Sequence, residues 1–465
     1  MEVLGILLSL FLLMFFAYRG FSVILFSPIF ALLAASMSGL SLMPAYTELF
    51  MAKAVVYVKS FFPVFMLGAV FGKVMEDTGL AKGISHSIIK GLGKERAILA
   101  VVLSGAVLTY GGVSLFVVVF AVYPFASALF REANIPKRLI PGSVALGAFT
   151  FTMDSFPGTP QIQNLIPTNF FGTNAYAAPV SGILGGLAIF FIGMWYLEGR
   201  RKSALAAGEG YGNHTINESP VTEDQNLPSW QIAMLPLLTV LVINFVMTRV
   251  YVWDPNLLQA FQAMKLPLLA PAVKNVISIW ALIVALVSGI VLAVALGFSR
   301  LPQGGLAKAL NAGAIGSLLA IMNTASEVGY GNVIASLPGF KAISSALLGI
   351  KVGGSPLVSE AVSVTTLAGI TGSASGGMSI ALDLMAKDWL AWANQIGMSP
   401  EILHRVASMA SGGMDTLPHN GAVITLLAVC GLTHRDSYRD IFAITCIKTA
   451  MVFAVIIFHS ITGIL

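Results

Sequence analysis

The sequence predicts an all-α protein that crosses a membrane many times and consists of two inverted-topology repeats. Three observations lead to this fold class: an apolar composition, a motif that occurs twice, and a charge distribution that reverses between the two copies. Apolar residues make up 57% of the 465 residues and charged residues only 10%. This is the balance of a chain solvated by lipid, not of a water-soluble enzyme.

Long apolar runs account for most of the predicted crossings. Each approaches or reaches the roughly 17 to 25 residues that a helix needs to span a bilayer. The first run has no basic segment before it, and Arg19 follows it, so we expect a retained first span with its N-terminus outside. The runs cover residues 3–18, 21–40, 61–74, 183–195, 230–250, 276–298 and 442–464.

The net charge of +5 does not indicate a nucleic-acid partner. The lysines and arginines lie in short clusters between apolar runs, as the positive-inside rule expects for a membrane protein. The two cysteines, Cys430 and Cys446, lack metal-ligand spacing. We therefore expect a protein of the bacterial inner membrane with no metal, no cofactor and no nucleic-acid partner.

A repeated motif divides the chain into two halves. MDSFPGTP at residues 153–160 aligns with MDTLPHNG at residues 414–421, and the same offset of 261 positions carries Gly111 onto Gly372. A polar stretch without apolar periodicity lies between the halves. We expect a first repeat at 1–197, a cytoplasmic linker at 198–228 and a second repeat at 229–465.

The connections of the two halves carry opposite charge patterns. Around residues 82–96 and 131–138 the first half is basic, whereas the matching segments 341–351 and 387–401 carry few cations or are acidic on balance. The pattern reverses at the end of each repeat. Since basic connections face the cytoplasm, matching segments lie on opposite sides, which defines an inverted repeat.

Each half is expected to contain a re-entrant hairpin and a broken span, giving about ten transmembrane helices in all. Residues 97–130 are too few for two crossings and a turn, and both flanks are basic. We expect this hairpin to turn near 110–114 and its counterpart to turn near 371–377. The predicted hairpins are 97–130 and 357–386, and the predicted broken spans are 139–172 and 402–431.

Glycine, proline and hydroxyl residues gather at the hairpin tips and at the breaks. Irregular backbone at membrane depth is tolerated only where it is buried in protein or lines a cavity, and broken helices expose N–H and carbonyl groups that bind anions and cations. These clusters predict a transport site. Its candidate substrate-binding residues are Gly111, Gly112, Ser114, Ser155, Thr159, Gln161, Gly372, Ser373, Ser375, Thr416, His419 and Asn420.

Three carboxylates are candidates for ion coupling: Asp154, Asp415 and Glu327. A carboxylate inside a membrane is a functional hypothesis because burying it uncompensated costs several kcal/mol. The two aspartates occupy equivalent positions. Each could instead cap the half-helix that follows it, and Glu327 could be a span-end residue that faces water.

Other polar residues of the spans have simpler expected roles. His419 could relay a proton, donate a hydrogen bond or be purely structural. Glu360 is expected to be solvated, and Lys448 to snorkel to the cytoplasmic surface. No arginine is expected at a mid-membrane break, so N-termini of helices and Ser, Thr and Asn donors would hold a carboxylate, and one carboxylate suits such a site better than three.

The tip at residues 372–375, the first break with FPGTP at 156–160, and the segment 415–421 resemble the gluconate permease (GntP-type) family of the ion transporter superfamily. The resemblance spans nearly the whole chain. It implies a homodimer, an elevator-like movement of the hairpin-bearing part, and symport of a hydroxylated or short-chain carboxylate with a proton. Sugar-acid members place an acidic residue where this chain has Gly111, Gly112 and Val113.

The first break resembles the 3-hydroxybutyrate branch of that family. The expected function is therefore proton-coupled, or else sodium-coupled, symport of a small hydroxy-monocarboxylate. A citrate or dicarboxylate symporter is the alternative within transport. An intramembrane enzyme is the alternative from another class, since Ser155, His419 and Asp415 form a triad-like set, but no nucleophile-elbow sequence is present.

Overall fold

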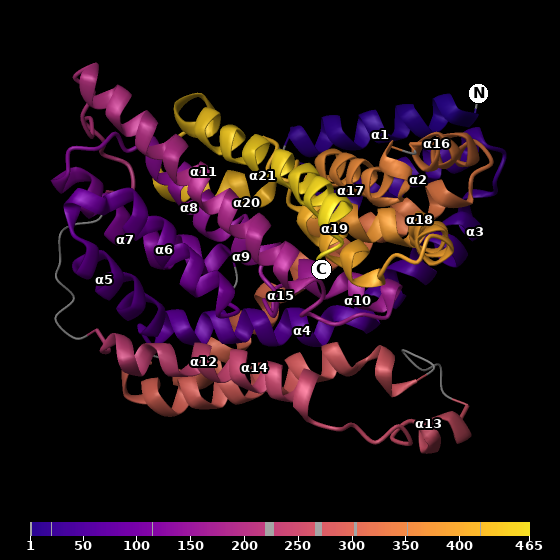
Figure 1. Cartoon of the computed structure of the whole chain (residues 1–465), viewed down its shortest axis with the longest axis horizontal. Helices are drawn as coiled ribbons and strands as arrows, with labels where there is room; N and C mark the ends of the chain where they lie inside the picture. The colour runs from indigo at the N-terminus through magenta and orange to yellow at the C-terminus, as the bar shows by residue number, and fades with distance from the viewer. Residues whose placement is uncertain are drawn as a thin grey trace.

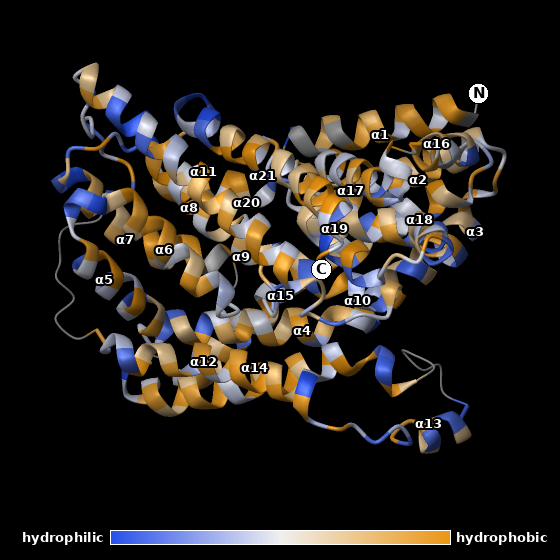
Figure 2. Ribbon diagram, in the orientation of Figure 1, coloured by the Kyte–Doolittle hydropathy of each residue, from blue (hydrophilic) through white to orange (hydrophobic). Residues whose placement is uncertain are grey.

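The computed structural model describes residues 2–19, 21–113, 115–218, 227–265, 272–301, 305–350, 352–418 and 420–465, and these residues form helices and turns without strands. Most long helices run roughly along the longest axis of the molecule (Figure 1). Their middle parts are mainly apolar, and hydrophilic residues gather towards the two ends of the molecule (Figure 2). An all-helical, multi-pass membrane fold is confirmed.

Within the described residues, six helical segments are long and apolar enough to cross a bilayer. One of them, Gly305–Ser336, is not among the long apolar runs of the sequence, because glycine and polar residues interrupt its apolar character. The six segments are Leu42–Asp77, Pro179–Ala206, Trp230–Val250, Ile277–Arg300, Gly305–Ser336 and His434–Thr462.

The first half of the chain forms α1 (Glu2–Tyr18), α2 (Val23–Met37), α3 (Leu42–Pro44), α4 (Ala52–Asp77), α5 (Leu80–Leu92), α6 (Ala97–Tyr110), α7 (Leu115–Glu132), α8 (Leu139–Ala148), α9 (Phe151–Asp154), α10 (Ile166–Phe171) and α11 (Pro179–Ala206). Helix α11 continues into the segment expected to be the linker.

The second half forms α12 (Trp230–Phe245), α13 (Gln259–Ala263), α14 (Ile277–Gly297), α15 (Gly305–Ser336), α16 (Phe340–Leu348), α17 (Leu357–Thr371), α18 (Ala374–Gln395), α19 (Pro400–Ser411), α20 (Gly421–Cys430) and α21 (His434–Thr462).

Two pairs of consecutive helices form helical hairpins. Helices α6 and α7 pack against each other and against α8, and helices α17 and α18 pack against each other and against α19. The second hairpin turns at Gly372, whose φ of 66° is in the left-handed region that glycine adopts without strain. We call the turn after α6 tip 1 (residues 109–113) and the turn after α17 tip 2 (residues 371–376).

Helical structure is interrupted within residues 139–172 and again within residues 402–431. Helix α9 ends at Asp154, and the chain runs through a non-helical stretch and one 3-10 turn before α10 begins at Ile166. In the second half, α19 ends at Ser411 and α20 begins at Gly421. We call these interruptions break 1 (residues 155–165) and break 2 (residues 412–420).

Helices α4 and α15 pack along each other, and α15 also contacts α2 and α18. The close approach is possible because Gly313 has no side chain: a Cβ there would lie 2.6 Å from the Cα of Val70. Helix α14 packs on α4 and on α12. Large apolar side chains on the outer helices, such as Phe11, Val291 and Ile461, point away from the protein, as lipid contact requires.

A charge network joins the ends of three helices. Asp440 at the start of α21 is buried and pairs with Arg138 and Arg200, and Tyr196 donates a further hydrogen bond to it. The segment after α11 is also held, since Glu218 pairs with Lys137 at 2.7 Å. This network fixes how α8, α11 and α21 meet, and therefore how the broken spans lie.

Candidate functional site

Tip 1 lies directly on break 1. Gln161 donates from Nε2 to the carbonyl of Thr109 at 2.7 Å, and the Tyr110 hydroxyl donates to the carbonyl of Pro157 at 2.8 Å. Gly112 faces Pro160, while Gly111 packs tightly against Leu237 of α12. The backbone groups that a turn leaves unpaired are thus partly satisfied by the break.

Tip 2 lies on break 2 in a similar manner. Asn420 donates from Nδ2 to the carbonyl of Gly372 at 2.7 Å, and its Oδ1 accepts from the N–H of Val423 at 2.9 Å. It therefore caps α20 and holds tip 2 at the same time. Ser373 caps α18 by accepting from the N–H of Gly376, and Ser375 contacts Thr324 of α15 at 3.4 Å.

The two broken spans meet at Asp154. Its carboxylate pairs with the ammonium of Lys448 from α21, and both side chains are 0% exposed. Ser155 donates to the other oxygen of Asp154 at 2.9 Å, and Ser408 of α19 donates to its backbone carbonyl at 2.8 Å. The expectation that Lys448 snorkels to the surface is wrong, since Lys448 lies at the middle of α21, about 20 Å from either end.

Asp415 lies in break 2, within electrostatic range of Lys448 and Asp154. It is buried, and its Oδ1 has no hydrogen-bond partner in the described part of the chain. The alternative that the two aspartates cap the following half-helices is wrong. Asp154 is the last residue of α9 and binds Lys448, and Asn420 is the residue that caps α20.

Arg405 of α19 is buried behind break 1. Its guanidinium donates to the carbonyls of Asp154 and Ala177 and to Oδ1 of Asn164, and His404 also contacts Asn164. Arg405 belongs to α19 and not to a break, but it reaches break 1 from outside, which the sequence did not predict. Because its recorded bonds go to neutral oxygens, Arg405 supports the shape of break 1.

Glu327 lies inside α15, not at a span end, and is only 3% exposed. The alternative in which it faces water is wrong. Its carboxylate lies against the first turn of α18, where a Cβ at Gly376 would collide with it. Ser373 lies beside it, and its Oε2 has no hydrogen-bond partner among the described residues.

A polar cluster surrounds Glu327. Tyr57 of α4 is buried next to it, and Thr324, Ser375 and Ser379 lie near the Tyr57 hydroxyl. The hydroxyls of Tyr57 and Ser379 have no hydrogen-bond partner within the described residues. Donors and a carboxylate from α4, α15 and α18 therefore converge where tip 2 leads into α18.

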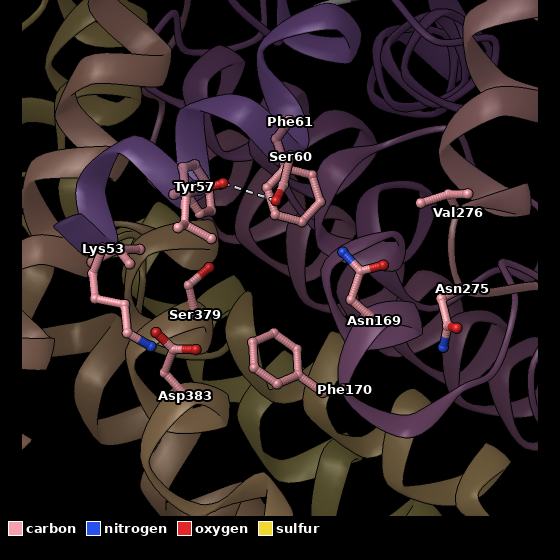
Figure 3. Close-up of a pocket in the computed structure, with 12 residues that line it drawn as sticks. Lys53, Tyr57, Ser60, Phe61, Asn169, Phe170, Asn275, Val276, Ser379 and Asp383 are labelled. Atoms are coloured by element: carbon pink, nitrogen blue, oxygen red, sulfur yellow. Dashed lines mark hydrogen bonds between the residues drawn. The ribbon is translucent and has the colours of Figure 1, made fainter. Parts of the chain in front are cut away.

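A cleft of about 240 Å³ extends from this cluster to the surface. Its inner part holds Tyr57 and Ser379, and its outer part holds the exposed residues Lys53 and Asp383 (Figure 3). Asn169 of α10 also lines it. The lining offers both charged and hydrogen-bonding groups.

Two of the candidate residues, Ser114 and His419, lie outside the described residues. Glu360, expected to be solvated, is instead fully buried in α17, and neither carboxylate oxygen has a partner in the described ranges. Thr159 and Thr416 are buried and bonded within the protein: Thr159 donates to the carbonyl of Thr152, and Thr416 contacts Thr445.

Sequence reasoning missed Lys448, Arg405 and the cleft residues. A lysine at the centre of a long apolar helix cannot reach water, and this signal could have identified Lys448. Likewise, Arg405 lies within a predicted broken span. Tyr57 and Ser379 gave no signal, because a single tyrosine or serine in a span is an ordinary packing residue.

Many apolar helices, two hairpins and two breaks with buried charges define a polytopic membrane transporter. The chain belongs to the GntP permease family, whose model, described as "GntP family permease", matches residues 1–387. The family and the relatives below are transporters, so the protein is not an enzyme.

Two relatives and one solved structure extend this assignment. The chain is 54% identical to the uncharacterized transporter YxjC of Bacillus subtilis (strain 168) over the full length of both proteins. It is 29% identical to the high-affinity gluconate transporter of Escherichia coli (strain K12) over 41% of each chain. The structure of MtrF from Neisseria gonorrhoeae, described within a class of antimetabolite efflux pumps, aligns with a TM-score of 0.55 at 11% identity, covering 90% of this chain and 85% of that one. This shows a shared fold.

Proposed function

We propose that the protein is a proton-coupled symporter of a small hydroxy-monocarboxylate such as 3-hydroxybutyrate. Secondary transport of an organic anion follows from the family, and the gluconate transporter among the relatives supports a hydroxylated acid as substrate. The observation that carries proton coupling is Glu327, a buried carboxylate against the first turn of α18.

The position of Glu327 makes proton and substrate binding interdependent. The first turn of a helix offers free N–H groups and a positive dipole end to an anion. A charged Glu327 fills that place and repels a second carboxylate. Once Glu327 binds a proton, the repulsion disappears and the substrate carboxylate can approach tip 2. Asp154 and Asp415 are the other proposed coupling residues.

The substrate site is proposed to lie between the tips and the breaks. Its residues are those named from the sequence, including Ser114 and His419, and the cleft beside Tyr57 is the proposed approach to it. The guanidinium of Arg405 is engaged by carbonyl and amide oxygens and so does not offer its charge to further carboxylates. A substrate with one carboxylate therefore suits the site better than citrate.

The proposed architecture is a pair of inverted repeats, 1–197 and 229–465, joined by a cytoplasmic linker. Two features support it. Both halves contain a hairpin followed by a broken span. In addition, α2 of the first half packs on α15 of the second half, just as α14 of the second half packs on α4 of the first. We propose that α4 and α15 lie where the moving hairpins meet the scaffold spans, and that the protein works as a homodimer with an elevator-like movement.

Uptake of labelled 3-hydroxybutyrate into liposomes containing the purified protein tests this function. An inward pH gradient and a sodium gradient are imposed separately, and gluconate and citrate are offered as competitors. We expect accumulation with the pH gradient alone and competition by short hydroxy acids. Uptake of citrate in place of 3-hydroxybutyrate, or dependence on the sodium gradient, would contradict the proposal.

A further inference from the structure

The centre of the molecule holds one ammonium group between the two broken spans. Lys448 Nζ pairs with Asp154 at the end of α9 and also donates to the carbonyl of Phe149 at 3.3 Å. The ammonium and the carboxylate are both completely buried. Water cannot solvate either charge in this position. Removing one partner would leave the other as a buried, unpaired charge, which is strongly destabilising.

The second broken span reaches the same stretch of α21. Thr416 contacts Thr445, which precedes Lys448 by one helical turn. The adjacent residue, Asp415, has a buried oxygen without a hydrogen-bond partner in the described part of the chain. Lys448 therefore pairs with one carboxylate, that of Asp154 directly before break 1, and the carboxylate of Asp415 in break 2 lies within the range of its charge without an ion pair to it.

Little free space remains between the breaks around this ammonium. A Cβ at Gly412 would collide with both Lys448 Nζ and the carboxylate of Asp154. Another buried cation, Arg405, donates to the carbonyls of Asp154 and Ala177. Lys448 is thus the cation that pairs with the carboxylate directly before break 1.

We propose that the Lys448 ammonium is the built-in cation of the paired breaks and takes the place that a sodium ion would otherwise occupy. Unwound segments with carboxylates and free carbonyls are sites at which membrane carriers bind sodium. A tethered ammonium supplies the same charge without leaving, so sodium neither binds there nor drives transport. The inference that sodium does not bind at this place stands without the proposed function. Only its consequence for ion coupling rests on the proposed function.

Thermal unfolding of the purified protein in detergent tests the inference without any substrate. The wild type, Lys448→Arg and Lys448→Ala are compared in sodium chloride and choline chloride at equal ionic strength. Lys448→Ala removes the charge and leaves space for an ion and water. We expect about 100 mM sodium to raise its midpoint by about 3 to 5 °C over choline. The wild type and Lys448→Arg should give the same midpoint in both salts.

A sodium-specific rise in the wild-type midpoint would overturn the proposal, whatever the variants do. So would a folded Lys448→Ala that does not respond to sodium. If Lys448→Ala can be purified only in sodium, that result supports the proposal. If it cannot be purified at all, Asp154→Asn/Lys448→Ala replaces it; one carboxylate then remains, and we expect a smaller response to sodium but not its absence. A wrong substrate assignment changes none of these outcomes.

Discussion

The two buried acids Asp154 and Glu327 are accommodated in opposite ways. Asp154 has a lysine and a serine as partners, whereas Glu327 has an oxygen without a partner in the described residues. A buried charge with a matched partner is a fixed part of the structure, while one without a partner costs several kcal/mol whenever it is charged. The comparison supports the proposal that Glu327, beside tip 2, is the group whose charge changes, because Asp154 is already held in an ion pair with Lys448.

Asp154→Asn should produce the largest loss of stability. It leaves the Lys448 ammonium buried without its partner, which costs about 3 to 5 kcal/mol. The midpoint of thermal unfolding in detergent is the measurement. The double variant Asp154→Asn/Lys448→Met removes both charges and should recover most of the loss. Equal stability of the single variant and the wild type would show that the pair is not a structural charge pair.

Glu327→Gln should affect transport and not stability, the opposite of Asp154→Asn. Removing a charge that lacks a partner should leave the midpoint unchanged or raise it, while accumulation driven by a pH gradient should fall by about tenfold or more, the range that proton-transfer groups contribute. Glu360→Gln is the matched control, since Glu360 is also buried without recorded partners but lies away from the cleft. It should retain uptake. Full gradient-driven uptake by Glu327→Gln would remove Glu327 from the coupling mechanism.

The positions of hairpins and breaks could be predicted from the sequence because they depend on local signals. Glycine at the tips, proline in the breaks and the repeated motif at residues 153–160 and 414–421 mark them directly. Among the described candidate residues, Gly111, Gly112, Gly372 and Ser373 lie at the tips, and Ser155, Thr159 and Gln161 lie in break 1. Burial of single polar side chains could not be predicted in this way, because it depends on which helices pack together.

Lys448 and Glu360 show this limit most clearly. Each was assigned to water by its distance from a span end or a hairpin base, and each is fully buried. Lys448 is buried because both breaks converge on the middle of α21, and Glu360 because α17 packs between α18 and α19. Neither of these long-range contacts can be deduced from the residues that neighbour Lys448 or Glu360 in the sequence.

Tyr57→Phe should give a smaller effect, confined to the cleft beside Glu327. The hydroxyl has no hydrogen-bond partner in the described residues, so its removal should not lower stability. If it contacts the substrate on its way to tip 2, its loss should raise KM by about five- to tenfold, the value of one hydrogen bond. Ser60→Ala, at the cleft wall with its hydroxyl bonded to Val56, is the control. An unchanged KM for Tyr57→Phe would place the substrate path elsewhere.

The smallest expected effect lies at the surface, where an exposed ion pair contrasts with the buried one. Arg138 binds Glu209 with two hydrogen bonds of 2.7 and 2.8 Å, and these hold the pKa of Glu209 below its usual value. A lowered pKa in the folded protein means that the pair stabilises the fold above the pKa of the unfolded chain, and that this contribution disappears as the pH falls through the folded value. Glu209→Gln should therefore cost at most about 1 kcal/mol near pH 7 and nothing at low pH. A large loss at pH 7 would mean that this end of α8 is held mainly by Glu209 and not by the buried Asp440.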